Sequence, residues 1–200
     1  GVFIEADTKK INECRRNYPS NDICLINQFV GAPNRDVPGK CLKELLNENN
    51  INLEDIKVLS IDVDGPDLDI FIDLKFKPPL IIIEGGTNYS PYLNKNVEVS
   101  KSIASKNNQQ PFPFIFDQVM KKGYRIVCFQ QDSYLVREDL IDKFEIFDHL
   151  QLYKDSWYFH TKESRELIKY IRSKNKFIKN LEEKHLGFFD PNPLSMKSKS

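Results

Sequence analysis

Residues 58–86, VLSIDVDGPDLDIFIDLKFKPPLIIIEGG, contain the pattern that decides the fold class of this chain. Two short apolar runs, Val58–Ile61 and Leu80–Ile83, have the length and the β-branched composition of buried strands. Between them, residues 68–74 place apolar side chains at helical spacing, behind a Pro66 that suits the first turn of a helix. The stretch therefore predicts a strand–helix–strand unit whose two strands run parallel.

The same alternation of strands and helices continues on both sides of this unit. It predicts an α/β fold: a Rossmann-like, mostly parallel sheet with helices on both faces and a closing antiparallel hairpin. The flanking strands are expected at Val2–Ile4, 23–30, 124–129 and 133–136, and the flanking helices at 9–17, from Leu42 to the Asn49-Asn50 pair, and at 114–122.

The composition of the 200 residues is that of a globular protein with one domain and an appendage. Hydrophobic residues make up 40% and charged residues 29%, which excludes a disordered chain. The longest apolar run, Leu80–Ile83, is far shorter than the ~20 residues of a membrane span. Lys+Arg and Asp+Glu are equal at 29 each, so the net charge gives no argument for a nucleic-acid partner.

The character of the sequence changes after residue 143. We expect an α/β domain over 1–143, an aromatic-rich segment with a helical extension over 144–190, and a disordered tail over 191–200. The extension is predicted to contain a long helix from Lys162 to about Lys184. The sequence does not indicate an oligomeric state.

The four cysteines, Cys14, Cys24, Cys41 and Cys128, form no C-x-x-C pair and no zinc-like cluster with histidine. We interpret them as buried free thiols of a protein in a reducing compartment, which predicts a cytoplasmic location.

Three predicted strands end in a carboxylate: Glu5, Asp62 and Glu84. In an open α/β sheet, ligands bind beyond the carboxyl ends of the strands, so these acids form a site hypothesis. The alternative is that they are solvated acids that only cap the helices that follow. Asp62, Glu84 and Asn88 have the oxygen ligands that a hard cation such as Mg²⁺ prefers.

The stretch 42–84 resembles the FkbM family of S-adenosylmethionine-dependent methyltransferases. The motifs that carry the resemblance are Leu42-Lys-Glu-Leu45-Leu46, Leu59-Ser-Ile-Asp62-Val-Asp64-Gly65 and Ile81-Ile-Ile-Glu84. Residues 122–127 and 134–137 look like the family's closing helix and hairpin, and residues 1–7 look like its second strand. The resemblance covers roughly residues 1–140.

The resemblance implies O-methylation of a hydroxyl on a glycan or small metabolite. It implies that Glu5, with Ala6 beside it, holds the ribose hydroxyls of the cofactor, and that Phe29 and Val30 flank the adenine. Asp62 then borders the methionine end of the cofactor, and Asp62, Asp64 and Glu84 are the candidate catalytic acids, with Mg²⁺ as a possible additional cofactor.

The family's first strand and Gly-rich turn would precede Gly1, so we interpret the sequence as truncated at its N-terminus and expect the fragment itself to be inactive. Two alternatives stay open. One is a non-catalytic binding or scaffold domain of the same fold. The other is a haloacid-dehalogenase-like phosphatase with Asp62 as the nucleophile and Asp64 as the acid/base, although Pro66 and Glu84 depart from that family's pattern.

Residues 87–111 are polar and irregular. We expect them to form a mobile cover over the acceptor, with Tyr89 and Tyr92 facing a sugar ring.

Overall fold

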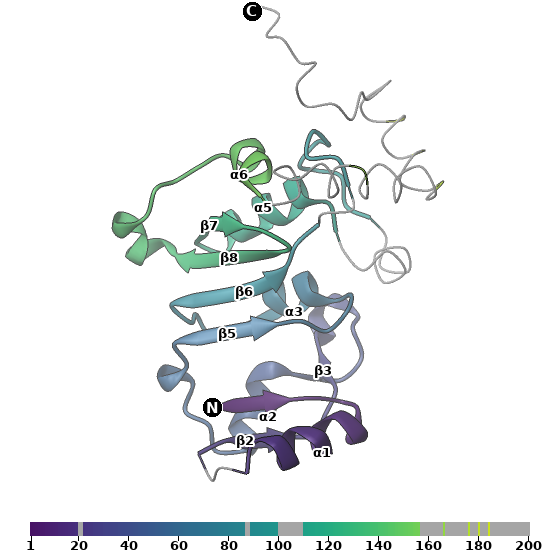
Figure 1. Cartoon of the computed structure of the whole chain (residues 1–200), viewed down its shortest axis with the longest axis vertical. Coiled ribbons are helices and arrows are strands. Elements are labelled where there is room, and N and C mark those ends of the chain that lie inside the picture. The colour runs from purple at the N-terminus through teal and green to yellow at the C-terminus, as the bar shows by residue number, and fades with distance from the viewer. Residues whose placement is uncertain are drawn as a thin grey trace, which may run out of the picture. The chain divides into compact units, whose positions relative to one another are not determined.

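The computed structural model is α/β, as predicted, with helices and parallel strands that alternate along the chain (Figure 1). The described strands form two two-stranded parallel sheets and one four-stranded mixed sheet, whereas the sequence predicted one mostly parallel sheet. The structure describes residues 1–19, 22–86, 89–99 and 110–156, together with Glu166, Lys176, Asn180 and Lys184.

The described chain divides into two compact units. The first contains Gly1–Ile56 and Asp69–Lys77, and the second contains Lys57–Leu68 and Pro78–Ser200. The boundary crosses helix α3 (Asp67–Asp73), so the first two residues of this helix belong to the second unit.

The first unit opens with a parallel strand pair joined by a helix. Its elements are β1 (Val2–Ile4), α1 (Thr8–Asn17) and β2 (Cys24–Ile26). Asp7 caps α1, because its carboxylate accepts hydrogen bonds from the amides of Lys9 (2.7 Å) and Lys10 (3.3 Å). The strand expected over 23–30 is shorter than predicted and ends at Ile26.

The rest of the first unit is built from short elements. They are β3 (Val30–Gly31), β4 (Lys40–Cys41), α2 (Leu42–Glu48) and the 3-10 turns η1 (Pro33–Arg35) and η2 (Leu53–Asp55). α2 buries Leu42, Leu45 and Leu46 and ends at Asn49, which confirms the predicted helix. Arg35 pairs with Asp69 of α3 at 2.9 Å and so ties η1 to that helix.

The second unit contains a four-stranded sheet in the order β5-β6-β8-β7 (Figure 1). Its strands are β5 (Val58–Ile61), β6 (Leu80–Glu84), β7 (Tyr124–Phe129) and β8 (Asp132–Arg137). β5 and β6 are parallel, while β8 is antiparallel to both β6 and β7. The predicted closing hairpin is therefore present, and its second strand lies next to β6.

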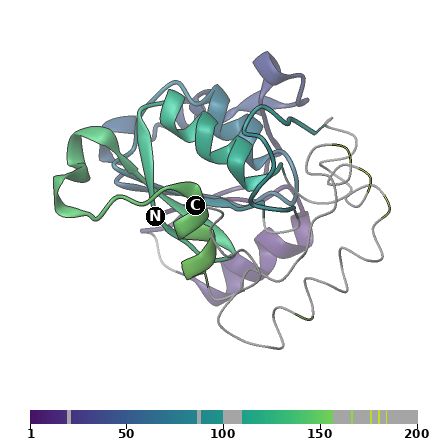
Figure 2. The ribbon, with the colours of Figure 1, turned by 90° about the horizontal axis from the view of Figure 1, so that it is seen from above.

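The core of the second unit is apolar and aromatic. Ile81, Ile83 and Leu135 are fully buried on the central strands. The helices α5 (Phe112–Lys121) and α6 (His149–Asp155) both lie against β7 (Figure 2). The ring of Phe112 stacks on that of Phe129 at a centroid distance of 3.9 Å, and the Tyr153 ring lies beside both.

Residues 89–99 and 110–111, the described part of the segment between Gly86 and α5, contribute buried side chains. Four side chains of this segment, Tyr89, Leu93, Val97 and Val99, are buried. The side-chain amide of Gln110 also binds the backbone of Val99 twice, donating to its carbonyl (2.7 Å) and accepting from its amide (2.8 Å). The prediction that Tyr89 faces a sugar ring is wrong for this structure, because Tyr89 is fully buried. Tyr92 is half-buried.

Several predictions fall on residues outside the described part of the chain. These are Asn88, the stretch 100–109, most of the predicted helix 162–184 and the tail 191–200. Within the predicted helix, Glu166, Lys176, Asn180 and Lys184 are described, and all four are helical. The domain boundary at residue 143 stays a prediction, although α6 beyond it packs on β7.

All four cysteines are free and half-buried. Among the described residues, the helices are too short or too polar to cross a bilayer.

Gly86 tests how tightly the segment after β6 is packed. A Cβ at this position would lie 2.0 Å from the carbonyl oxygen of Gln110 and 2.5 Å from the amide nitrogen of Phe112. Gly86→Ala is expected to lower the free energy of unfolding by about 1–3 kcal/mol, because the backbone of residues 110–112 must move to make room for the new Cβ. Urea denaturation measures the loss, and Gly1→Ala, whose Cβ meets nothing within 4 Å, is the matched control. Equal stability of the two variants contradicts the packing.

Candidate active site

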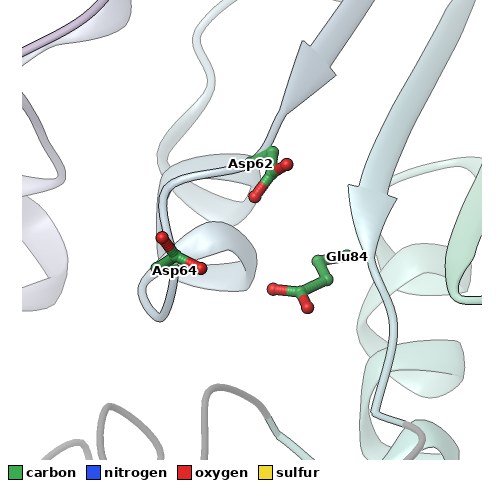
Figure 3. Close-up of side chains that lie close together, drawn as sticks. All are labelled: Asp62, Asp64 and Glu84. Atoms are coloured by element: carbon green, nitrogen blue, oxygen red, sulfur yellow. The ribbon is translucent and has the colours of Figure 1, made fainter. Parts of the chain in front are cut away.

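Three carboxylates converge at the carboxyl ends of β5 and β6 (Figure 3). The parallel register pairs Ile61 with Ile83, so the next residues, Asp62 and Glu84, lie at the same edge of the sheet. One oxygen from each of Asp62, Asp64 and Glu84 lies within 4.8 Å of the other two. The two strand-end acids predicted to meet are therefore neighbours, while their catalytic role stays a prediction.

Asp64 joins the cluster because the chain turns after β5. On an extended strand, residues two apart point to opposite faces, and Asp64 would then face away from Asp62. β5 ends at Ile61, however, and Asp64 adopts a left-handed conformation with φ 56°. This conformation costs an L-residue roughly 1–2 kcal/mol, so other contacts must hold it.

A carboxylate from α3 supplies those contacts. Asp67 accepts a hydrogen bond from the amide of Val63 through Oδ1 (2.9 Å) and one from the amide of Gly65 through Oδ2 (3.0 Å). The side chain is 2% exposed. Burial raises the pKa of Asp67 above its ordinary value, with a contribution from the nearby Asp62 charge, while the two amide hydrogen bonds oppose that shift. The sequence analysis did not single out Asp67, although an acid directly after a Gly-Pro turn is a signal for such a role.

A fourth acid, Asp132, lies opposite Glu84 in the antiparallel pairing of β6 and β8. Burial raises the pKa of Asp132, and the negative charge of Asp62 raises it further. The sequence analysis missed this residue because it is 48 positions after Glu84 and only the sheet brings the two together.

The cluster has the ligand chemistry that hard cations require. Its donors are carboxylate oxygens, and a cation among them would offset the mutual repulsion of the acids. In the part of the chain that the structure describes, neither Asp62 nor Asp64 commits its carboxylate to a hydrogen bond or an ion pair. The three oxygens lie within 4.8 Å of one another, close enough for a single hard cation such as Mg²⁺ or Ca²⁺ to contact all three.

Four of the residues predicted to bind the cofactor, Glu5, Ala6, Phe29 and Val30, belong to the first unit, whereas Asp62 belongs to the second. Glu5 follows β1, and its Oε1 accepts a hydrogen bond from the amide of Asp7 (2.8 Å). Asn27 fixes this strand end by donating to the carbonyls of Glu5 (2.8 Å) and Ala6 (3.0 Å). Phe29 was expected at the end of the second strand, but it follows β2 by three residues and is 51% exposed, and Val30 begins β3.

No family model, no curated protein and no solved structure matches this chain.

Cation binding tests the cluster directly. Asp62→Asn is expected to weaken Tb³⁺ binding, used as a luminescent substitute for Ca²⁺, by roughly tenfold or more, because one of three charged ligands becomes neutral. Sensitised luminescence titration measures the affinity. Asp142→Asn changes an exposed acid elsewhere in the same unit and should leave the affinity unchanged. A loss of the same size in both variants would indicate non-specific charge attraction.

The pH dependence of stability tests the position of Asp132. A carboxyl group whose pKa is raised in the folded state lowers stability once the pH exceeds its ordinary value of about 3.8, because the fold disfavours the charged form. Asp132→Asn should therefore raise the free energy of unfolding at pH 7, by a few tenths to about 1 kcal/mol, and the gain should vanish below about pH 4. Urea unfolding across pH 3–8 measures this. A gain that persists at pH 3 contradicts the electrostatic cause.

Proposed function

We propose that this chain is part of an S-adenosylmethionine-dependent O-methyltransferase with a Rossmann-like fold. The observation that carries the proposal is the convergence of Asp62, Asp64 and Glu84 beyond two adjacent parallel strands, the edge at which α/β enzymes bind their ligands. The acceptor is proposed to be a hydroxyl group of a glycan or small metabolite.

The order of elements from β5 to β8 supports this assignment. The parallel strands β5 and β6, joined by α3, are followed by α5 and the β7–β8 hairpin. The resemblance to the FkbM family implies the same series: a strand that ends in Asp-x-Asp-Gly, a helix, a strand that ends in Glu, then a helix and a closing hairpin.

The acidic cluster has the chemistry that an oxygen nucleophile needs. When bound, S-adenosylmethionine supplies an electrophilic methyl group on a positively charged sulfur. A carboxylate of the cluster would accept a hydrogen bond from the acceptor hydroxyl and would take up its proton. Asp62 and Asp64 suit this role because their oxygens are exposed and are not engaged by the described residues.

Two further groups complete the proposal. Glu5 keeps Oε2 available for ribose hydroxyls while Oε1 binds the amide of Asp7, so a carboxylate of this kind fits a diol. A cation on Asp62, Asp64 and Glu84, with Mg²⁺ or Ca²⁺ as candidates, would favour the ionised hydroxyl as a Lewis acid. The free thiols of the four cysteines support the cytoplasm as the place of action.

Cofactor binding is the first test. Isothermal titration with S-adenosylmethionine and with S-adenosylhomocysteine is run on this chain and on the longest reading frame that contains it. Glu5→Gln is expected to weaken binding by roughly tenfold, because a charged acceptor of two hydroxyl donors becomes neutral. Glu13→Gln, on the exposed surface of α1, is the control. Absence of binding to both forms of the protein excludes the methyltransferase and leaves the scaffold alternative.

Methyl transfer is the second test. With ³H-methyl-labelled cofactor and a panel of glycans and hydroxylated metabolites, Asp62→Asn is expected to lower the rate about 10²-fold or more, because a base or a cation ligand is lost at constant shape. Chelator treatment followed by Mg²⁺ or Ca²⁺ separates the cation role from direct base catalysis. Full activity of Asp62→Asn contradicts both roles, and Mg²⁺-dependent hydrolysis of p-nitrophenyl phosphate would favour the phosphatase alternative.

A further inference from the structure

We propose that Asp67 is the positioning residue of this site: it holds the turn 62–66 so that Asp62 and Asp64 face the same ligand. The inference rests on the proposed function for the role of the two acids, but the geometry that it invokes is a property of the turn itself.

The Asp67 carboxylate accepts hydrogen bonds from two amides of the turn that presents the acids. Its two oxygens accept from the amides of Val63 and Gly65, which are the residues directly after Asp62 and directly after Asp64. The residue that follows Asp62 and the residue that follows Asp64 therefore both donate their amides to the Asp67 carboxylate. Rotation of either peptide away from Asp67 would swing the neighbouring acid out of the cluster.

The turn needs such a partner because its backbone is unusual. Asp64 has φ 56° and Gly65 has φ 153°, so two successive residues lie outside the conformations that L-residues prefer. Gly65 adopts its conformation at little cost because it has no Cβ. Asp64 has a Cβ, so its left-handed conformation has a steric cost. Two hydrogen bonds to the buried Asp67 carboxylate fix the amides of Val63 and Gly65, on either side of Asp64.

The electrostatics argue that Asp67 serves the site rather than stability alone. A carboxylate that is 2% exposed and near the negative Asp62 is an unfavourable residue for folding by itself. A neutral acceptor would cap a helix start without this repulsion. The charged group instead binds both amides in a bidentate manner, which a single hydroxyl oxygen cannot reproduce in the same geometry.

Amide exchange tests the geometry without a ligand. In Asp67→Asn, which keeps one carbonyl acceptor at constant shape, at least one of the Val63 and Gly65 amides should exchange with solvent tenfold or more faster, while the amides of β5 and β6 stay protected. Asp73→Asn is the matched control, because Asp73 is a buried acid on the same helix that bonds instead to Asn34. Unchanged exchange at both amides in Asp67→Asn overturns the inference. If Asp67→Asn does not fold, Asp67→Ser takes its place with the same expectation.

Tb³⁺ affinity separates positioning from plain stability. Asp67→Asn should weaken Tb³⁺ binding about tenfold although Asp67 is not one of the three ligands, and Asp73→Asn should not. Wild-type affinity in Asp67→Asn, together with faster exchange, means that the turn is held for stability only and overturns the positioning role. If the wild-type chain does not bind Tb³⁺, the cation part of the proposed function fails. In that case the kinetics of methyl transfer test the positioning role of Asp67. If Asp67 positions the acids, Asp67→Asn has a lower kcat and an unchanged KM for the cofactor.

Discussion

The parallel register of β5 and β6 is the constraint on which the candidate site depends. It places Ile61 beside Ile83, and both side chains are buried in the core of the second unit. A shift of one residue would turn these apolar side chains to the opposite face, so burial fixes the register. The residues that follow, Asp62 and Glu84, are then brought to one edge of the sheet whatever their own charges prefer.

The charges at this edge oppose one another. Asp62, Asp64, Glu84 and Asp132 are brought near by backbone pairing and by the turn after β5, not by mutual attraction. The fold therefore holds an arrangement that Coulomb repulsion disfavours, and burial of apolar side chains beneath it supplies the compensating free energy. An excess of negative charge of this kind is what a cation or a proton-donating hydroxyl would relieve.

Close packing also constrains the described residues that follow β6, namely Gly85, Gly86, 89–99 and Gln110. Gly85 and Gly86 pass so close to Phe129 and to the backbone at Gln110 that no larger residue fits. Tyr89 and Val99 are buried, and the Gln110 side chain satisfies both the amide and the carbonyl of Val99 in a buried position. Sequence reasoning missed this packing because the apolar residues of 89–99 follow neither a helical nor a strand period.

The sequence by itself determined the α/β class, the strand–helix–strand order around Asp62 and the end of α2 at Asn49. These features depend on local periodicity and capping, which a linear pattern contains. Only the tertiary structure decided that Asp64 turns into the cluster, that Asp67 holds the turn and that Asp132 faces Glu84. Those relations depend on a backbone torsion, on burial and on a pairing between distant strands, and none of these has a period along the chain.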